Sequence, residues 1–547
     1  RESTDPTTED NVHNQAFRPA RLLVGGLTAV AVLLAGCASG NSDATAASTS
    51  PRQAGFVGEQ PDDAEPAAGG ALTFGSYSLP TVLDPARTQA AASTGGSEMA
   101  AIYDTLLRHD FDSRTFVPQL AETFEGSDDL TTYTVTLRPG TRFSDGSVLD
   151  AGAVKWSIER FVTAKGDASQ TWTNVVDTVD TPDELTVVFR LKRPWSDFPA
   201  LLSLGPGMIV GAGSDTGGTF TPVGAGPFTV TKFAPREELL LSARADYVGG
   251  EPALDTLRFV PTAGAQAQYE SMRSGQFDMT FILRDERVID QALADGYTGF
   301  LSPTGQNGIG VINSRPGRPG ADVRVRQAIA YGVDPEAINQ RANAGLGTAS
   351  SELVPEGSRW YSGAEGLRFD PERARELLDE AKADGFDGRI SYLTTQDPGQ
   401  QATALTVQAM LQSIGFDVAV DYATDTTDLV RKVYRDHDFD LTRGGAPIGE
   451  EAPFLNLYGS MGSDSRNNAT GFADPEMDRL LLAVQTAPTD DAKRDAIGDV
   501  QRYANETVPY VLWGPAAVLT AWEPTVHGVK RTVTDIMLFD DAWKSAG

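Results

Sequence analysis

Cysteine and histidine are scarce in this chain of 547 residues. Cys37 is the sole cysteine, so no intrachain disulfide can form and no cysteine-based zinc site can be built. A histidine-led metal site needs several histidines to converge, and the chain holds only four of them, spread from its amino-terminal segment to its carboxy-terminal segment. We therefore expect no metal site and no cofactor.

Positive charge is also in short supply. The 45 lysines and arginines face 75 aspartates and glutamates, which gives a formal net charge of -30. Nucleic acids and anionic membrane surfaces attract basic proteins, so this balance argues against either partner being held by electrostatics. An acidic surface mainly keeps a protein dispersed, and it does not by itself identify a cationic ligand.

The motifs that mark common enzymes are missing. The sequence contains no Gly-x-Ser-x-Gly elbow, no Gly-x-x-x-x-Gly-Lys-Ser/Thr loop and no His-Glu-x-x-His pair. Gly345–Ser350 is similar to part of a dinucleotide-binding fingerprint, but it follows a helical segment rather than a strand, so we interpret it as a loop. We expect no catalytic residues and no enzymatic activity.

The amino-terminal segment has the pattern of an export signal. Two arginines, Arg18 and Arg21, precede an apolar stretch over 22–35 that is too short to span a bilayer comfortably. Leu34–Cys37 resembles the bacterial lipobox, in which cleavage before the cysteine leaves a thiol that carries diacylglycerol. The alternative is a buried hydrophobic helix with an incidental cysteine. We predict that 1–37 is a signal peptide with a lipobox and that Cys37 is lipidated.

Residues 38–70 are rich in alanine, serine, threonine, glycine, proline and acidic residues. This composition is typical of a disordered tether. Two acyl chains hold a protein on a membrane durably. The sequence therefore predicts an exported protein, anchored by lipid to the outer face of the cytoplasmic membrane, whose folded part begins near Ala71.

The folded part alternates between strand and helix signals. Apolar residues occupy alternate positions in Tyr133–Leu137 and Leu185–Leu191, which predicts half-buried strands. Asp370 and Asp474 each precede a proline, a glutamate and an apolar stripe at helical spacing, which predicts capped amphipathic helices. Phe416–Tyr422 reads as a strand between helices. The chain is long enough for two or more lobes, and we predict an α/β fold with a mixed sheet.

An ordered series of short segments, which runs from Gly69 onward, resembles the family 5 extracellular solute-binding proteins of ABC importers. The most specific segments are Phe143–Gly146 and Ala153–Arg160. The others are Gly69–Gly75, Leu83–Pro85, Tyr103–Leu107, Pro118–Glu122, Gly224–Phe228, Asp246–Gly250, Ser274–Asp278, Val323–Ile329 and Gln408–Gly415.

This resemblance implies the two-lobe fold of large type II periplasmic binding proteins, in which a hinge joins the lobes and closes over a ligand. It places lobe I in 71–98, 222–305 and 510–547, an extra subdomain in 99–221, and lobe II in 306–509. It implies a monomer that captures a small solute, with peptide as the favoured cargo, and delivers it to ABC permease subunits and their ATPases. The alternatives are a surface sensor with the same fold, or a binder of an oligosaccharide, an opine-like conjugate or a metal chelate.

In peptide binders of this family a carboxylate receives the amino terminus of the ligand, as the resemblance implies. The matching segment here holds Ala446 in place of an aromatic residue and Gly449 in place of an aspartate, followed by Glu450 and Glu451. Either glutamate could bind the ammonium group, or the ligand could lack a free amine. The resemblance assigns ligand contact to Tyr77, Ser78, Arg443, Glu450, Glu451, Asn468 and Phe472. Trp360 and Trp513 are candidate walls of the site, although core packing is the favoured interpretation for both.

Overall fold

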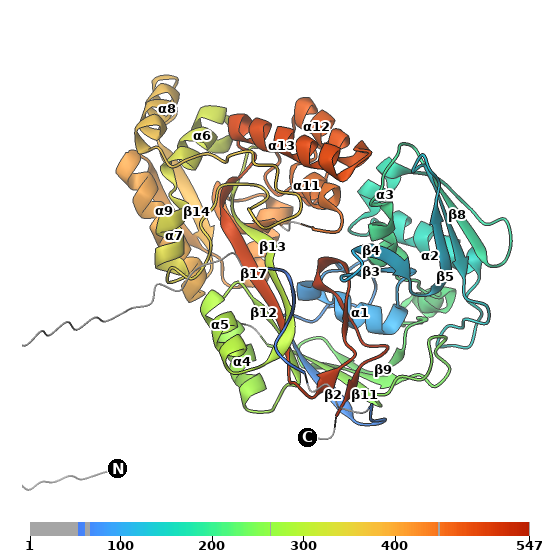
Figure 1. The fold of residues 1–547 in the computed structure, drawn as a ribbon. Coiled ribbons are helices and arrows are strands. Elements are labelled where there is room, and N and C mark those ends of the chain that lie inside the picture. Colours follow the sequence, from blue (N-terminus) through green and yellow to red (C-terminus); the bar gives the residue numbers. More distant parts are fainter. Residues whose placement is uncertain (1–52, 61–65, 263, 447–448, 546–547) are drawn as a thin grey trace, which may run out of the picture. The chain divides into compact units, whose positions relative to one another are not determined.

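The computed structural model describes residues 53–60, 66–262, 264–446 and 449–545 (Figure 1). The predicted signal peptide and Cys37 lie outside the described residues. From Pro51 onward the chain forms one compact unit. Among the described residues, no helix is both long enough and apolar enough to cross a membrane.

A mixed sheet of eleven strands runs through this unit, in the order β15-β14-β16-β13-β17-β12-β2-β11-β10-β9, with β1 paired to β13. The two long strands β13 and β17 lie antiparallel and side by side at its middle (Figure 1). The strands are β1 (Gly55–Val57), β2 (Ala71–Ser76), β9 (Phe228–Ala234), β10 (Glu238–Ala243), β11 (Thr256–Pro261), β12 (Met279–Leu283), β13 (Thr298–Ile312), β14 (Arg389–Thr394), β15 (Asp417–Tyr422), β16 (Leu441–Ala446) and β17 (Val511–Trp522).

Two helices of the carboxy-terminal half begin where the sequence predicts. The Asp370 side chain accepts a hydrogen bond from the Arg373 amide, and α8 (Pro371–Ala383) buries the predicted apolar stripe. The Asp474 side chain caps α12 (Pro475–Thr486) in the same way. The other long helices of this region are α6 (Val323–Gly332), α7 (Pro335–Ala342), α9 (Pro398–Ile414), α11 (Pro453–Met461) and α13 (Asp490–Thr507).

A second, smaller sheet is antiparallel and has the order β5-β6-β8-β7. Residues of β6 (Thr132–Leu137) alternate between half-buried and buried, and so do most residues of β8 (Thr186–Leu191), which confirms both predicted strands. The sheet packs against α2 (Ala151–Thr163) and α3 (Ser169–Val175), and we call this layer the β5–β8 subdomain. Its remaining strands are β5 (Ala121–Gly126) and β7 (Val176–Asp180).

Helix α1 (Gly96–Tyr103) belongs to the core beneath the main sheet. Every residue of α1 is buried, and its apolar residues pack in one cluster with Phe228 and Phe259. A Cβ at Gly226 would meet the backbone of Ile102 at 2.6 Å, so glycine allows the β9 turn to approach α1. The predicted boundary between residues 98 and 99 therefore cuts through a helix, and the structure places all of α1 with the main sheet.

Part of the predicted tether is ordered. Gly55–Val57 forms β1 and pairs with Gly299–Leu301 of β13. The Phe56 ring packs edge-on against Phe300, with ring centroids 5.1 Å apart, and lies 6.3 Å from the ring of Phe111. The expectation of disorder across 38–70 is therefore wrong for β1, because an aromatic side chain and an open strand edge give this short segment a place to dock.

The strands β13 and β17 pass from one half of the main sheet to the other. Near one end, Leu301 pairs with Leu519; near the other, Gly310 pairs with Val511 and with Arg443 of β16. The register of the β13–β17 pair shifts between Ser302 and Gln306 and again after Gly308. The predicted lobe boundary at 305/306 falls at the first shift, whereas that at 509/510 puts all of β17 in one lobe, although its first residues pair beside β16.

Beyond several 3₁₀ turns, further short elements belong to the described chain. They are β3 (Leu107–Asp110), β4 (Thr115–Pro118), α4 (Ala265–Arg273), α5 (Glu286–Ala294), α10 (Thr426–Val430), the π-helical turn Arg431–Asp436, and the pairs β18 (Val526–His527) with β21 (Trp543–Lys544) and β19 (Lys530–Arg531) with β20 (Met537–Leu538).

Candidate ligand site

Two arginines and two tyrosines from four separate segments interact electrostatically near the middle of the main sheet. Tyr77 directly follows β2, Arg284 directly follows β12, Arg443 lies within β16, and Tyr434 lies in the π-helical turn. Arg443, Tyr77 and Tyr434 all act electrostatically on Arg284. We call these four residues the arginine site.

Arg443 is held in a glycine-rich part of the sheet. Its backbone pairs with Gly310, and the next two residues of β16 are also glycines. The side chain is partly exposed, yet its Nε atom is buried and makes no hydrogen bond with any residue that the structure describes. Burial lowers the pKa of Arg443. A buried guanidinium nitrogen without a partner costs free energy, and an anionic ligand would recover it.

Arg284 was not among the residues predicted from the sequence. It adopts a left-handed conformation (φ 58°), and its amide donates to the Ala517 carbonyl at 3.0 Å. Burial, and then the charge of Arg443, lowers its pKa to about 10. The signal available in the sequence was weak: an arginine directly after a buried strand, on the edge where the parallel neighbour β2 leads into Tyr77.

The two glutamates proposed to bind an ammonium group have separate roles. Glu451 is buried and forms an ion pair with Arg531, which also bonds Asp535 at 3.0 Å. Burial acts to raise the pKa of Glu451, but the charges of Arg531 and then His109 outweigh it and leave that pKa lowered. Glu451 is therefore already paired within the protein, and its binding of a ligand amine stays a prediction.

Glu450 keeps a partly exposed carboxylate. Its carbonyl accepts hydrogen bonds from the Arg359 guanidinium at 2.7 Å and from the Trp360 indole at 2.9 Å. Its carboxylate lies 4.0 Å from Arg359. Burial raises the pKa of Glu450, and hydrogen bonding by Ser358 opposes that shift. Of the two glutamates, only Glu450 still has a carboxylate that a ligand could reach.

Three other predicted contacts serve the scaffold. The Ser78 hydroxyl donates to the Ser93 carbonyl at 2.8 Å. The Asn468 side-chain amide donates to the carbonyls of Gly462 and Phe472, at 3.1 and 2.7 Å, and so fixes a loop. The Phe472 ring is buried in the core, with the guanidinium of Arg326 5.8 Å from its centre. None of these three is drawn into the arginine site.

Trp360 and Trp513 are core residues, as the favoured interpretation of the sequence had it. Trp360 is fully buried, and the cations of Arg359 and Lys493 lie over its ring at 4.2 and 4.9 Å. Trp513 packs in the cluster formed by α6, α8 and α9.

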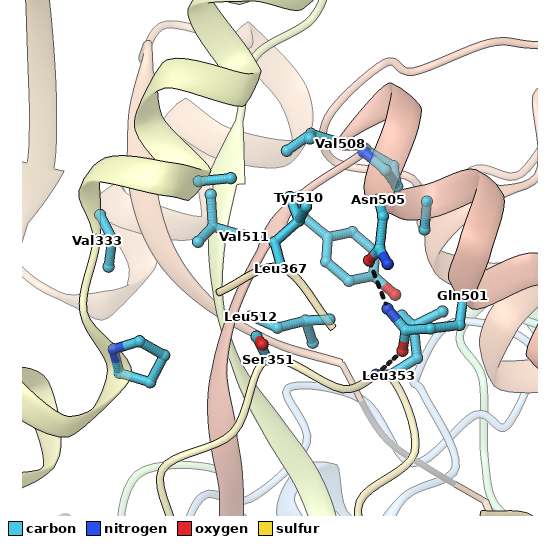
Figure 2. A pocket seen from close by; sticks show the side chains of 14 residues that line it. Val333, Ser351, Leu353, Leu367, Gln501, Asn505, Val508, Tyr510, Val511 and Leu512 are labelled. Carbon is cyan, nitrogen blue, oxygen red and sulfur yellow. Dashed lines mark hydrogen bonds between the residues drawn. The ribbon is translucent and has the colours of Figure 1, made fainter. Parts of the chain in front are cut away.

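Two small cavities in the described part of the chain do not include the arginine site. Figure 2 shows one between α13 and β17, where Gln501 accepts a hydrogen bond from the Leu353 amide and donates one to Asn505. A second is lined by Asn307, Gly449, Asn456 and Tyr510. None of the residues predicted to contact a ligand lines either cavity. Among the described residues, no group of histidines and carboxylates is arranged to hold a metal ion.

The long strands β13 and β17 join two halves of one sheet. Charged and aromatic side chains interact electrostatically near the place where the halves meet. This arrangement is that of a solute-binding protein of the two-lobe periplasmic type. Residues 115–467 match the family model of bacterial extracellular solute-binding proteins, family 5, and the chain belongs to this family.

Curated relatives and solved structures agree with this assignment. A Brucella ovis protein named as an ABC transporter peptide-binding protein is 27% identical over 485 residues, which cover 82% of this chain and 87% of the relative. The glutathione-binding protein GsiB of Salmonella typhimurium is 28% identical over 303 residues, which cover 54% of this chain and 58% of GsiB.

The structure of AgaA from A. tumefaciens R10 with agropinic acid is 26% identical and has a TM-score of 0.74, covering 87% of this chain and 99% of AgaA. The oligopeptide-binding protein AppA from Bacillus subtilis, solved with a nonapeptide, shares the fold with a TM-score of 0.75 at 20% identity, covering 88% of this chain and all of AppA. The chain is thus an exported substrate-binding protein of an ABC importer.

Proposed function

We propose that this protein captures a small solute at the arginine site, with peptide as the favoured cargo, and presents it to ABC permease subunits and their ATPases. The observation that supports this most is the electrostatic interaction of Arg284 with Tyr77, Tyr434 and Arg443, which lie in different segments of the main sheet and its loops. A guanidinium matches a carboxylate in shape and charge, and every unmodified peptide carries a terminal carboxylate. A curated relative that matches 82% of this chain is named as a peptide binder.

A non-peptide acid is the second candidate cargo. AgaA, which is similar to this chain over most of its length, was solved with agropinic acid. An opine-like conjugate would use the same arginines and would need no carboxylate such as Glu450 to receive an amine. A peptide and a conjugate would therefore both use the two arginines, and only the peptide would need the carboxylate of Glu450.

Mass spectrometry of small molecules released from the purified chain by denaturation tests this function. We expect a peptide or a related acid in roughly stoichiometric amount. Affinities for free and N-acetylated forms of one peptide then separate the candidates. A peptide amine held by Glu450 predicts weaker binding of the acetylated form, and the difference should disappear in Glu450→Gln. Recovery of a hydrolysed product in place of an intact ligand would contradict a pure binding role.

We further propose that Cys37 carries the lipid that anchors the protein to the outer face of the membrane, and that the folded part acts as a monomer divided into the two lobes and subdomain of the family. The support is the lipobox-like Leu34–Cys37 and the single cysteine of the chain. Expression of the gene with Cys37→Ala should release the protein from the membrane fraction into the soluble fraction. Unchanged membrane retention would show that another segment provides the anchor.

A further inference from the structure

A small cavity between β13 and α11 contains a buried hydrogen-bond acceptor without a partner. Asn307 is 2% exposed, and its side-chain amide donates to the Leu353 carbonyl at 2.7 Å. Its Oδ1 atom is buried and has no hydrogen-bond partner among the described residues. An amide oxygen left unpaired in the interior costs free energy, and a donor placed in the cavity would recover that cost.

Gly449 and Asn456 form a part of the cavity wall that stays partly exposed. Both residues are half-buried, whereas Asn307 and Tyr510 are buried. A Cβ at Gly449 would overlap Nδ2 of Asn456, so the Asn456 amide occupies the space into which a side chain at position 449 would project. The glycine therefore allows α11 to bring a second amide to the cavity, on the side from which a small group can enter.

The cavity suits a neutral group better than an ion. The centre of a water-sized sphere can move through about 10 Å³ of it, which is room for one small group. An ammonium group would lose its hydration there without gaining a carboxylate. The described residues that line the cavity carry no charge: besides the two amides they are Ser460, Tyr510, Gly449 and the apolar residues Leu353, Val354, Ala446, Pro453 and Leu457.

Resting on the capture function proposed above, we propose that this cavity is a subsite for one hydroxyl group of the solute. A hydroxyl is about the size of a water molecule, and it both donates and accepts. It can therefore donate to Oδ1 of Asn307 and accept from the amide of Asn456. None of the four residues of the arginine site lines the cavity, so the hydroxyl is a second recognised group in addition to the acid group of the solute.

Calorimetry with the purified full chain tests this subsite. The probes are trialanine and the three tripeptides in which serine replaces one alanine, so each serine peptide adds one hydroxyl group. We expect one serine position to improve the affinity by about 5- to 10-fold, which is the contribution of one neutral hydrogen bond. Diaminopropionate at that position replaces the hydroxyl by an ammonium group and should bind no better than alanine. Equal affinities of trialanine and all three serine peptides would overturn the subsite and leave peptide capture standing.

Variants at the partly exposed wall separate the subsite from general damage, because substitution of Asn307 would also remove its bond to the Leu353 carbonyl. Gly449→Ala adds a methyl group that displaces the Asn456 amide, and it should abolish the preference for serine. Gly459→Ala is the matched control: a Cβ at this half-buried glycine of α11 would meet nothing within 4 Å, so the preference should remain.

Asn456→Asp provides a readout that a merely structural role would not change. Its carboxylate should pair with the ammonium group of the diaminopropionate peptide, so that this peptide binds more tightly than the serine peptide. A serine preference that survives Gly449→Ala and keeps its order in Asn456→Asp would overturn the subsite.

The co-purified solute distinguishes failure of the subsite from failure of the capture function. Mass spectrometry of the solute released from the wild-type chain should find a hydroxyl group beside an acid group. A released solute without a hydroxyl group would overturn the subsite alone. A chain that releases no solute and binds none of the tripeptides would overturn the proposed capture function, and the subsite with it.

Discussion

Glu451 and Arg531 form a buried ion pair that ties the segment before α11 to the carboxy-terminal part of the chain. Both side chains are less than one-tenth exposed, and the Asp535 carboxylate bonds the same guanidinium and accepts a hydrogen bond from Ser302. Removal of one partner from such a network leaves a buried charge without compensation. This pair therefore affects stability more than it affects ligand recognition.

We predict that Glu451→Gln lowers the free energy of unfolding by about 3 kcal/mol, because Arg531 would keep only Asp535 as a partner. Urea denaturation followed by tryptophan fluorescence measures the change. Glu450→Gln is the neighbouring control and should cost less than about 1 kcal/mol, since its carboxylate is partly exposed and makes no close ion pair. Equal losses in the two variants would contradict this division of roles.

Glu98 and Asp104 are the buried acids at the two ends of α1. Burial raises the pKa of each to about 7. Ser76 donates to Glu98 at 2.6 Å, and Tyr247 donates to Asp104, whose pKa the nearby Asp540 raises further. Carboxyl groups in the unfolded chain titrate near pH 4. The folded state therefore holds protons that the unfolded state releases between about pH 4 and pH 7.

The stability that these two protonated acids provide is complete below about pH 4 and is lost as the pH rises through about 7. We predict that the double variant Glu98→Gln, Asp104→Asn loses less stability than the wild type between pH 5.5 and pH 8. Urea denaturation at several pH values gives the comparison. Asp110→Asn is a useful contrast, because hydrogen bonds from Ser113 and then Arg108 lower the pKa of Asp110 to about 2. This variant should therefore change the pH dependence of stability only at acid pH. Parallel pH profiles for wild type and double variant would refute the assignment.

At the scale of elements, the long strand β17 contains a glycine, Gly514, whose missing side chain leaves space for a neighbouring loop. Gly514 has φ 121°, a conformation that side chains rarely adopt, and a Cβ there would overlap the Thr348 carbonyl. The glycine therefore lets the 346–350 loop lie directly on the strand pair that joins the two halves of the sheet.

Gly514→Ala should destabilise the protein by about 3 kcal/mol or more, because it adds backbone strain to a clash with main-chain atoms. Gly140→Ala is the control for strain alone: Gly140 has φ 80°, but a Cβ there would meet nothing within 4 Å. Its expected cost is about 1 kcal/mol. Thermal unfolding of both variants would separate the two contributions, and similar losses would show that the loop yields without cost.

At the scale of the whole folded unit, polar and aromatic contacts join α13 and α11 to the loop that follows β8. The Lys493 ammonium lies 2.7 Å from both carboxylate oxygens of Asp197 and is almost fully buried. Trp195 packs edge-on against Phe454 of α11, with ring centroids 5.4 Å apart. These contacts link parts of the chain that the resemblance to the family predicts to lie in different lobes.

We predict that Lys493→Met favours separation of the lobes. In the closed state of this variant the Asp197 carboxylate is buried without a partner, whereas in an open state water can hydrate it. Small-angle X-ray scattering should show a larger radius of gyration than for the wild type at equal solute concentration. Arg494→Met is the matched control, since it removes the adjacent cation of α13 from an exposed pair with Asp491. An unchanged radius in Lys493→Met would show that apolar packing alone holds the contact.

The sequence by itself determined those features that depend on neighbours along the chain. The caps at Asp370 and Asp474 and the alternating strands β6 and β8 lie where the sequence predicts them, because a cap needs only the next few residues and a strand pattern only its own side chains. The order of motifs also identified the family. The lipidation of Cys37 stays a prediction.

Only the tertiary structure decided which distant residues meet. It paired Glu451 with Arg531 across 80 positions, brought Arg284 within electrostatic range of Arg443, joined α1 to the core of the main sheet, and docked β1 on β13. The physical reason is the same in each case. Folding decides which group lies beside a charge or an apolar face, and the residues nearby in the sequence do not indicate which group that is.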